Sequence, residues 1–473
     1  MPCAHCNARR IPPLLLLIPA FFAGCEPSKE SGATAPSNQK GASFVPYRGD
    51  VNHTGVFNTR PPEPPITVKW KRPWKWEWVD PKRELTDTPT SAIIVGDTLY
   101  IGLDTKFVDA RYNSETHAMG GILAVDKRTG KEKWRYEAGH QVAKTPKGRP
   151  IKAGGAGLRE LAFEGGVVVS SYFVPKQDGH VMRVEDGTEV AMPGYPPEEV
   201  FFAIDENGSL MWELVRKSSG ERLDRYSAQF LDGKVFLPGS DGTLYALDTR
   251  SGDVRWTFST AGLSLQQLLL FGNSLVFSTR NYDGKNLYCV DAATGQGIWA
   301  HEYLQSIVGG IGGCALRDGV IYSIHGDQAP TRAIDATNGN LIWKDSPGQF
   351  GNTRPVVDSI HMYVGNTGRL AGLDRKTGAV QWNSIVGNEW IAPSGVKLYR
   401  QIEELAAVGD VLYGLDAAWT IYAVSAASGS TQWKATIAGG DDQSLSPSEL
   451  LVGPIIDDGV LFAGWKDSLY AVE

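Results

Sequence analysis

Short hydrophobic runs alternate with glycine-containing turns along most of this 473-residue chain. In one unit, Tyr226–Leu231 is followed by a turn at Asp232-Gly233 and by the run KVFLPGS. The run Leu244–Asp248 comes next, and after a second glycine turn the unit ends at Trp256. Apolar runs of this kind between Gly and Asp turns are typical of β-strands joined as hairpins. The pattern therefore predicts four antiparallel strands per unit and an all-β chain.

The unit repeats along the chain. Its most regular part is Ala124-x-Asp126-x-x-Thr129-Gly130-x-x-x-Trp134, of which seven whole copies occur, one of them a residue shorter. The Asp carboxylate can accept backbone N–H groups in the turn, and Gly permits a positive φ there. Four-stranded units of about 40–45 residues are typical of β-propeller blades.

An eighth unit is split between the two ends of the repeat region. The C-terminal run GVLFAGWKDSLYAVE supplies strands and stops at Glu473, in the Asp position, with no Trp after it. Near the other end, Ile66–Trp70 is a strand ending in Trp with no unit before it. Pairing the two closes the ring and removes free sheet edges. We therefore predict an eight-bladed β-propeller. Its docking tryptophans are Trp70, Trp134, Trp212, Trp256, Trp299, Trp343, Trp382 and Trp433.

The N-terminal residues are typical of an export signal. Two arginines precede the apolar run Ile11–Ala23, which is too short and too rich in proline to span a membrane as a helix. The sequence Phe22-Ala23-Gly24-Cys25 resembles the lipobox of bacterial lipoproteins, which implies a lipid on Cys25; ordinary signal cleavage nearby is the alternative. Residues 26–43 contain no large apolar side chain, which predicts a flexible tether. The expected domains are a signal peptide (1–24), a tether (25–43) and the propeller (44–473).

Charge and export narrow the partners. The net charge is −7 and the pI is near 5.7, so the chain has no basic footprint for nucleic acid. A lipid on Cys25 would hold the protein on a bacterial envelope membrane, facing the periplasm, and we favour the outer membrane. We expect a monomer.

The repeat resembles the tryptophan-docking repeat of the pyrroloquinoline quinone (PQQ) propeller superfamily over residues 44–473. The lead-in Tyr47-Arg48-Gly49-Asp50, followed by Thr54-Gly55, is similar to that of bacterial members. This resemblance implies one of two classes. Some members are PQQ- and calcium-dependent alcohol or sugar dehydrogenases, and others are non-catalytic scaffolds such as the propeller lipoprotein of the outer-membrane barrel-assembly machinery.

The scaffold class fits the sequence better. The alcohol dehydrogenases carry a disulfide between adjacent cysteines, and no two cysteines are adjacent here. Their calcium-binding and catalytic carboxylates have no matching positions in this chain, and a fold alone does not confer chemistry. No His/Cys/carboxylate cluster has metal-ligand spacing. We therefore predict an envelope-associated binding or assembly scaffold without cofactor or catalytic residue; the alternative is a dehydrogenase that uses PQQ and calcium.

Insertions are expected on one face of the propeller. Alternating strand directions place the connections between second and third strands, and between blades, on one face, which we call the loop face. The opposite face, here the short-turn face, carries Asp-Gly and Thr-Gly turns. Long ordered loops on a rigid scaffold commonly carry function. The insertions are 104–120, 135–158, 174–199, 383–400 and 434–448.

Charged residues are expected at the channel mouth on the loop face. Four arginines there could bind a protein partner or a polycarboxylate or phosphate ligand; ion pairing among these residues is the simpler interpretation. Trp390, with Tyr112 and Tyr195, could anchor a protein partner. Trp74, Trp76 and Trp78 are expected to pack against a loop or blade rather than bind sugar. The mouth residues are Arg159, Glu160, Arg225, Arg354, Arg400 and Glu449.

Overall fold

Residues 39–473 form one compact unit of the computed structural model. All elements of the described residues are β-strands. The described residues are 44–46, 48–50, 53–73, 85–109, 114–144, 150–153, 158–174, 180–183, 189–192, 197–218, 228–260, 265–279, 286–302, 313–324, 330–345, 353–366, 368–391, 397–416, 419–437, 450–465 and 468–473.

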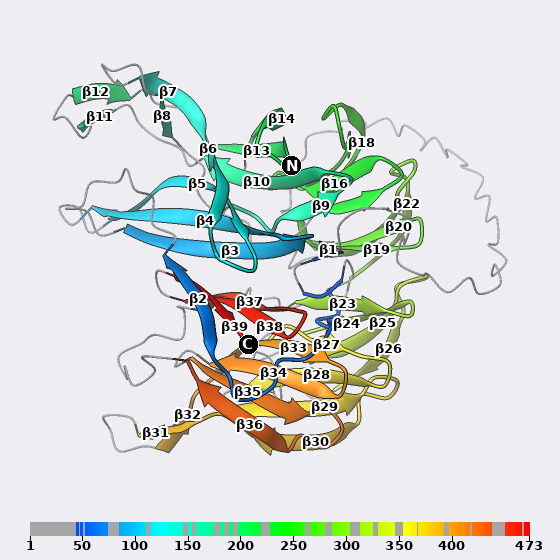
Figure 1. Ribbon diagram of the computed structural model, residues 1–473. Helices are drawn as coiled ribbons and strands as arrows, with labels where there is room; N and C mark the ends of the chain where they lie inside the picture. Colours follow the sequence, from blue (N-terminus) through cyan, green and yellow to red (C-terminus); the bar gives the residue numbers. More distant parts are fainter. Residues whose placement is uncertain are drawn as a thin grey trace, which may run out of the picture. The chain divides into compact units, whose positions relative to one another are not determined.

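Eight antiparallel sheets form the blades of a β-propeller, as the repeat predicts (Figure 1). Blades 2 to 7 each contain four strands in sequence order from the axis outwards. Blade 1 has a fifth strand on its axial side, and the outer strand of blade 8 comes from the N-terminal part of the chain. The two-stranded hairpins described below form separate sheets. Blades 1 to 4 contain β3 (Leu85–Val95), β4 (Thr98–Asp109), β5 (Ser114–Asp126) and β6 (Glu132–Ala138); β9 (Ala162–Glu164), β10 (Val167–Val174), β13 (Glu198–Asp205) and β14 (Leu210–Lys217); β15 (Gln229–Leu231), β16 (Lys234–Pro238), β17 (Thr243–Asp248) and β18 (Val254–Ser259); β19 (Leu265–Phe271), β20 (Ser274–Thr279), β21 (Leu287–Asp291) and β22 (Gly297–His301).

The second half of the ring repeats the arrangement. Blades 5 to 8 contain β23 (Cys314–Arg317), β24 (Val320–Ser323), β25 (Arg332–Asp335) and β26 (Leu341–Lys344); β27 (Val356–Val357), β28 (His361–Asn366), β29 (Arg369–Asp374) and β30 (Val380–Ile385); β33 (Ile402–Val408), β34 (Val411–Asp416), β35 (Thr420–Ser425) and β36 (Thr431–Thr436); β37 (Leu450–Asp457), β38 (Val460–Trp465), β39 (Ser468–Val472) and β2 (Val68–Pro73).

The ring closes through the N-terminal strand. β2 is the outer strand of blade 8 and pairs antiparallel with β39, with Trp70 opposite Ala471. Thr67 and Glu473 exchange two backbone hydrogen bonds, of 2.7 and 3.0 Å, just before the strand. The predicted strand Ile66–Trp70 is therefore paired as expected but extends to Pro73, because the ladder continues along β39 to Ser468.

Tryptophans join neighbouring blades through one repeated contact. The indole N–H of Trp212 donates to the Thr249 carbonyl of the next blade at 2.9 Å. Gly252 lies flat on that indole, where a Cβ would come within 2.7 Å of a ring carbon. Such contact requires glycine, which also has φ +75 there. The same indole-to-carbonyl bond is made by Trp70, Trp134, Trp256, Trp299, Trp343 and Trp382.

The Asp of the repeat organises the turn that receives the indole. In blade 1, the Asp126 carboxylate accepts the backbone N–H of Thr129 at 2.8 Å and its hydroxyl at 2.7 Å. These bonds favour the ionised form and lower the pKa of Asp126. The turn is thus built from local contacts, which explains why its spacing is so regular.

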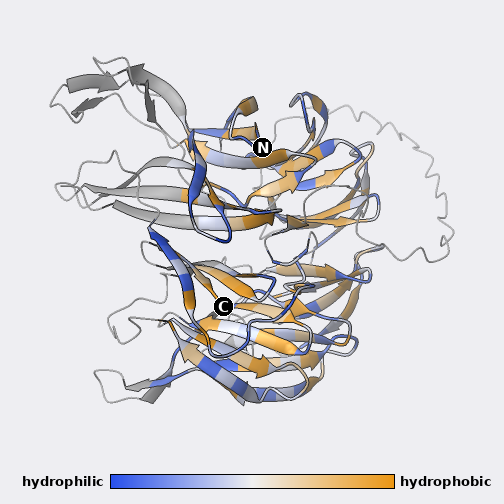
Figure 2. Cartoon of the chain, viewed as in Figure 1, coloured by the Kyte–Doolittle hydropathy of each residue, from blue (hydrophilic) through white to orange (hydrophobic). Residues whose placement is uncertain are grey.

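Hydrophobic residues are frequent on the inner and middle strands of the blades (Figure 2). β10 is buried along its whole length, whereas the outer strand β18 alternates between exposed and half-buried side chains. Outer strands face solvent on one side, so they keep the alternating pattern of a half-buried sheet.

Four of the predicted insertions lie on the loop face, and three of these form hairpins. These are β7 (His140–Lys144) with β8 (Pro150–Ala153), β11 (His180–Arg183) with β12 (Glu189–Met192), and β31 (Glu389–Ile391) with β32 (Lys397–Tyr399). A fourth insertion is the prolonged ladder between β4 and β5. All four project to the left in Figure 1. Of the fifth insertion, 434–448, residues 438–448 lie outside the described residues.

The N-terminal residues cross the short-turn face. β1 (Phe44–Val45) adds a fifth strand to blade 1, on the axial side of β3, with Phe44 opposite Val95. Val95 directly precedes the short β3–β4 turn, so the chain enters the propeller at the short-turn face. The repeat does not predict this strand, because it lies before the first copy.

Candidate functional site

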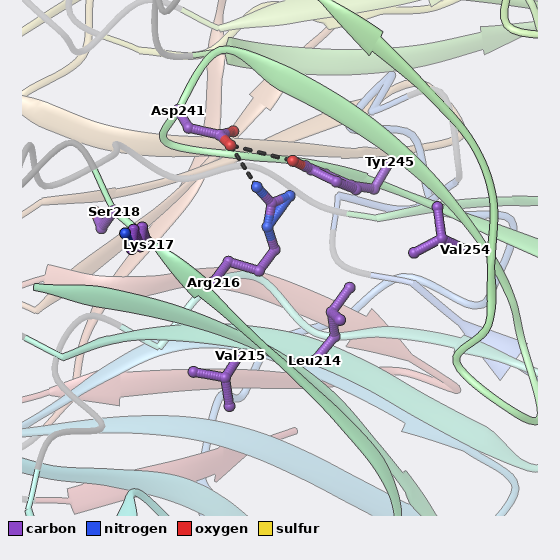
Figure 3. Close-up of a pocket in the computed structure, with 8 residues that line it drawn as sticks. All are labelled: Leu214, Val215, Arg216, Lys217, Ser218, Asp241, Tyr245 and Val254. Atoms are coloured by element: carbon purple, nitrogen blue, oxygen red, sulfur yellow. Dashed lines mark hydrogen bonds and ion pairs between the residues drawn. The ribbon is translucent and has the colours of Figure 1, made fainter.

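A groove opens between the outer parts of blades 2 and 3. We call it the rim groove; its volume is about 590 Å³. One wall is the end of β14, which leads into the connection to the next blade, and the other comes from the β16–β17 turn with β17 and β18. Both the end of β14 and the β16–β17 turn belong to the loop face. The lining residues are Leu214, Val215, Arg216, Lys217, Ser218, Asp241, Tyr245 and Val254 (Figure 3).

A fixed guanidinium lies at the centre of the rim groove. Arg216 forms an ion pair with Asp241 and lies over the Tyr245 ring, with its central carbon 3.5 Å from the ring centroid. The Tyr245 hydroxyl donates to the Asp241 carboxylate at 3.1 Å, which completes a triad across the two blades (Figure 3). A side chain held in this way loses little conformational entropy when a partner binds.

Apolar side chains flank this triad. Val215 is 46% exposed and Val254 is 49% exposed. Both belong to strands, so their positions are fixed by the sheets. Lys217 adds an exposed positive charge beside them. Arginine and an aromatic ring beside apolar surface is the composition of protein-binding hot spots.

The sequence does not predict the rim groove. Arg216 and Asp241 are 25 residues apart and belong to different blades, so no local motif links them. One feature of the sequence could have indicated the groove: the polar β16–β17 turn at Gly239–Gly242 is short, whereas other connections of the loop face carry insertions.

A second polar group, the axial charge cluster, consists of Arg48, His53, Glu160, Arg354 and Glu404. Arg354 and Glu160 form an ion pair at 2.8 Å, with side chains that are 11% and 2% exposed. Arg48 lies 3.5 Å from Glu404, with side chains that are 4% and 13% exposed. The two arginines and two carboxylates balance in charge, so each buried ion has a counterion, as burial requires.

Close packing fixes Arg354 in this cluster. Gly313 lies against the Arg354 stem, where a Cβ would come within 2.8 Å of Cγ. This agrees with an inner strand that passes near a crowded axis.

The other mouth residues lie apart from this cluster or outside the described residues. Arg159 is buried and lies 4.0 Å from Glu199, also buried. Arg400 is half-buried beside the β31–β32 hairpin, where its backbone N–H donates to Asn388 at 2.9 Å. Trp390 lies in β31, and only its backbone belongs to the described part of the structure. Outside the described residues lie Cys25, Trp74, Trp76, Trp78, Tyr112, Tyr195, Arg225 and Glu449.

Two cysteine thiols are the other groups that we considered as reactive or metal-binding among the described residues. Cys289 and Cys314 are free thiols, and burial raises the pKa of each to about 12, so both are protonated at neutral pH. Within the described ranges, no three His, Cys, Asp or Glu side chains gather where they could hold a metal ion. The same ranges contain no helix long and apolar enough to cross a membrane.

Comparison with known proteins places this propeller in a family. The family model described as outer membrane protein assembly factor BamB matches residues 71–264 and 283–473, which is most of the chain. The chain belongs to the BamB family. BamB of Shewanella oneidensis is 25% identical over 307 residues, 58% of this chain and 73% of that protein. BamB of Yersinia pestis is 27% identical over 193 residues, and the match spans 37% of this chain and 46% of the relative, less than half its length.

The propeller fold extends beyond the BamB family. Quinohemoprotein alcohol dehydrogenase from Comamonas testosteroni superposes with a TM-score of 0.57 and 13% identity, covering 91% of this chain and 80% of that chain. At this identity the likeness concerns the fold alone, because enzymes and scaffolds share this architecture.

Proposed function

We propose that the chain is a non-catalytic assembly scaffold of the bacterial envelope, which binds a protein partner through its loop face and acts as a monomer. The rim groove carries this proposal, because it combines a fixed arginine, an aromatic ring and the exposed Val215 on that face. Membership of the BamB family supports an assembly role, since its relatives are named outer membrane protein assembly factors.

The path of the N-terminal residues supports the use of the loop face. β1 enters at the short-turn face, and the chain then bonds to Gly459 in the short β37–β38 turn, where Arg60 accepts a backbone hydrogen bond of 2.9 Å. The short-turn face is therefore partly covered by the chain itself. We therefore assign partner binding to the loop face, which carries the hairpins.

A negative charge introduced at Val215 tests whether the rim groove binds a protein partner. We expect Val215→Asp to reduce capture of barrel-assembly proteins from the native envelope at least about tenfold, which corresponds to about 1.4 kcal/mol. A buried, unpaired carboxylate in an interface carries such a cost. Quantitative capture on the immobilised protein measures the effect.

A matched control is available on an outer strand near the short-turn face. Val380 begins β30 just after the Gly378 turn and is 46% exposed, the same fraction as Val215. Val380→Asp should leave capture unchanged, and both variants should melt like the parent. Equal capture by the two variants would contradict a role for the rim groove.

Envelope attachment is proposed to depend on a lipid at Cys25. Cys25→Ala should move the exported protein from the membrane to the soluble periplasmic fraction, because stable anchoring needs acyl chains that the variant lacks. Fractionation followed by immunoblotting measures this distribution. Unchanged membrane association of the variant would argue against lipidation.

The dehydrogenase alternative fits the described residues poorly. A calcium ion with PQQ requires several oxygen ligands that are free to coordinate it. The buried carboxylates Glu160 and Glu404 near the axis are instead bound by Arg354 and Arg48. A cluster that already balances its own charge is a poor site for a divalent cation, so we derive no reaction through PQQ.

A further inference from the structure

The chain places one of its own segments at the propeller axis. Residues 53–57 together with Arg48, which we call the axial segment, lie between the inner strands of blades 6 and 7. The Val357 N–H donates to the Thr54 carbonyl at 2.8 Å, and the Ala407 N–H donates to the Gly55 carbonyl at 2.8 Å. Val56 forms a parallel bridge with Ala407. The axial segment thus joins two blades through backbone hydrogen bonds and one isolated β-bridge.

Glycine allows this close approach. A Cβ on Gly55 would come within 2.7 Å of the Val356 side chain, and Gly55 has φ +74. Its N–H donates to the Arg48 carbonyl at 2.9 Å, which folds the segment into a tight loop. The loop is also held by the Asp50 carboxylate, which accepts the Thr54 backbone N–H at 3.0 Å.

The axial segment carries charged groups into the protein interior. Arg48 donates to the Pro355 carbonyl and to Glu404, and its Nε lies 3.4 Å from the His53 carbonyl. His53 is 8% exposed and has φ +56. Nothing in the proposed scaffold function uses this histidine.

We propose that the axial segment is a pH-dependent lock, which docks between blades 6 and 7 when His53 is neutral and is released when His53 is protonated. Release uncovers the ends of β27 and β33 at the short-turn face. The lock is independent of partner binding at the rim groove, which lies on the other face.

Burial sets the direction of the effect, and nearby charges modify it. Glu160 from the start of blade 2 favours a positive imidazolium, whereas Arg354 from the start of blade 6 and Arg48 from the same segment oppose it. Glu160 is already neutralised by Arg354, and Glu404 by Arg48. The Asp50 carboxylate in the same loop is engaged by Thr54. Burial is the largest effect and lowers the pKa of His53 to about 4.

The sign of the pH dependence follows from this lowered pKa. The released segment, with an ordinary histidine near 6.5, binds more protons than the docked one between pH 6.5 and pH 4. Docking is therefore strongest above pH 6.5 and weakens as the pH falls towards 4. At pH 5 the ratio of docked to released forms should be about 30-fold lower than at pH 7.5.

Amide hydrogen exchange on the full chain tests the lock. Exchange rates of Phe57, Val357 and Ala407, corrected for the intrinsic effect of pH, should show about 30-fold less protection at pH 5 than at pH 7.5. The Ala292 amide of blade 4, which donates to Asn273 at 2.8 Å, serves as an internal control and should not change. Protection that is equal at both pH values would overturn the proposal.

A neutral variant separates His53 from other titrating groups. His53→Asn has no charge to gain and tolerates a positive φ, so it should keep its protection at pH 5. If this variant loses the same protection at pH 5, another group causes the pH dependence, and the proposed lock is refuted. If the variant does not fold, the imidazole resonance of His53 in the parent decides: titration near pH 4 supports the lock, and titration near 6.5 overturns it.

Discussion

A chain that starts at Trp74 rather than Phe44 should lose cooperative unfolding. It lacks β1, the axial segment and β2, so blade 8 has no outer strand and the Trp70 indole no longer bonds to Lys127 in blade 1. Without β2 the strand β39 has an unpaired edge, and without β1 the axial edge of β3 is unpaired. The expected loss is comparable with the whole stability of a domain, about 5–15 kcal/mol. Urea unfolding followed by tryptophan fluorescence and circular dichroism measures it.

The matched control for this truncation starts at Phe44. It removes residues 1–43 and keeps every strand of the ring, so its unfolding midpoint and slope should equal those of the longer chain. If the chain starting at Trp74 unfolds with the same midpoint and slope as this control, closure by β2 does not stabilise the propeller.

Removing one carboxylate of the axial charge cluster should also lower the free energy of unfolding strongly. Glu160→Ala should destabilise the protein by about 3–5 kcal/mol, because the buried guanidinium of Arg354 loses its counterion. Chemical denaturation measures the change. The double variant Glu160→Ala/Arg354→Ala should recover part of the loss, since it removes the stranded charge.

A surface ion pair provides the comparison. Arg255 pairs with Asp248 at 2.7 Å, and the Arg255 side chain is 51% exposed. Arg255→Ala should therefore change the stability far less than Glu160→Ala. A Glu160→Ala effect no larger than this would mean that the axial pair is not the buried contact described here.

The repeat predicts the blades well because its contacts are local. Asp126 bonds to Thr129 within one turn, and the glycine that follows needs a positive φ whatever the rest of the chain does. The tryptophan contacts the next copy of the same turn. Sequence spacing therefore carries enough information to predict eight blades, the closing strand and the face that carries the insertions.

The sites depend on contacts that spacing does not encode. Arg48 and Glu404 are 356 residues apart, and Arg354 and Glu160 are 194 residues apart. The sequence predicts Arg159 and Arg354 near the channel mouth, but the carboxylate that each contacts depends on the packing of inner strands. Arg159 is buried and the Arg354 side chain is only 11% exposed, which the composition at a strand start does not predict.

The resemblance to family members identifies the lead-in at the N-terminal end of the propeller but does not explain its residues. The lead-in Tyr47-Arg48-Gly49-Asp50 is similar to that of bacterial family members, but its similarity does not state what it contacts. The structure gives the reason for its glycine: a Cβ on Gly49 would come within 2.1 Å of the Val56 carbonyl oxygen. Such close approach is visible in the folded chain and not in the local sequence.

Site-specific photo-crosslinking in intact cells tests the loop-face proposal most directly. One variant carries the photoreactive residue at Lys217 in the rim groove, and the other carries it at Lys131 in the short turn of blade 1; both side chains are exposed. We predict a discrete crosslinked complex with a barrel-assembly protein from position 217 and none from position 131. A complex formed from position 131 and absent from position 217 would contradict the account.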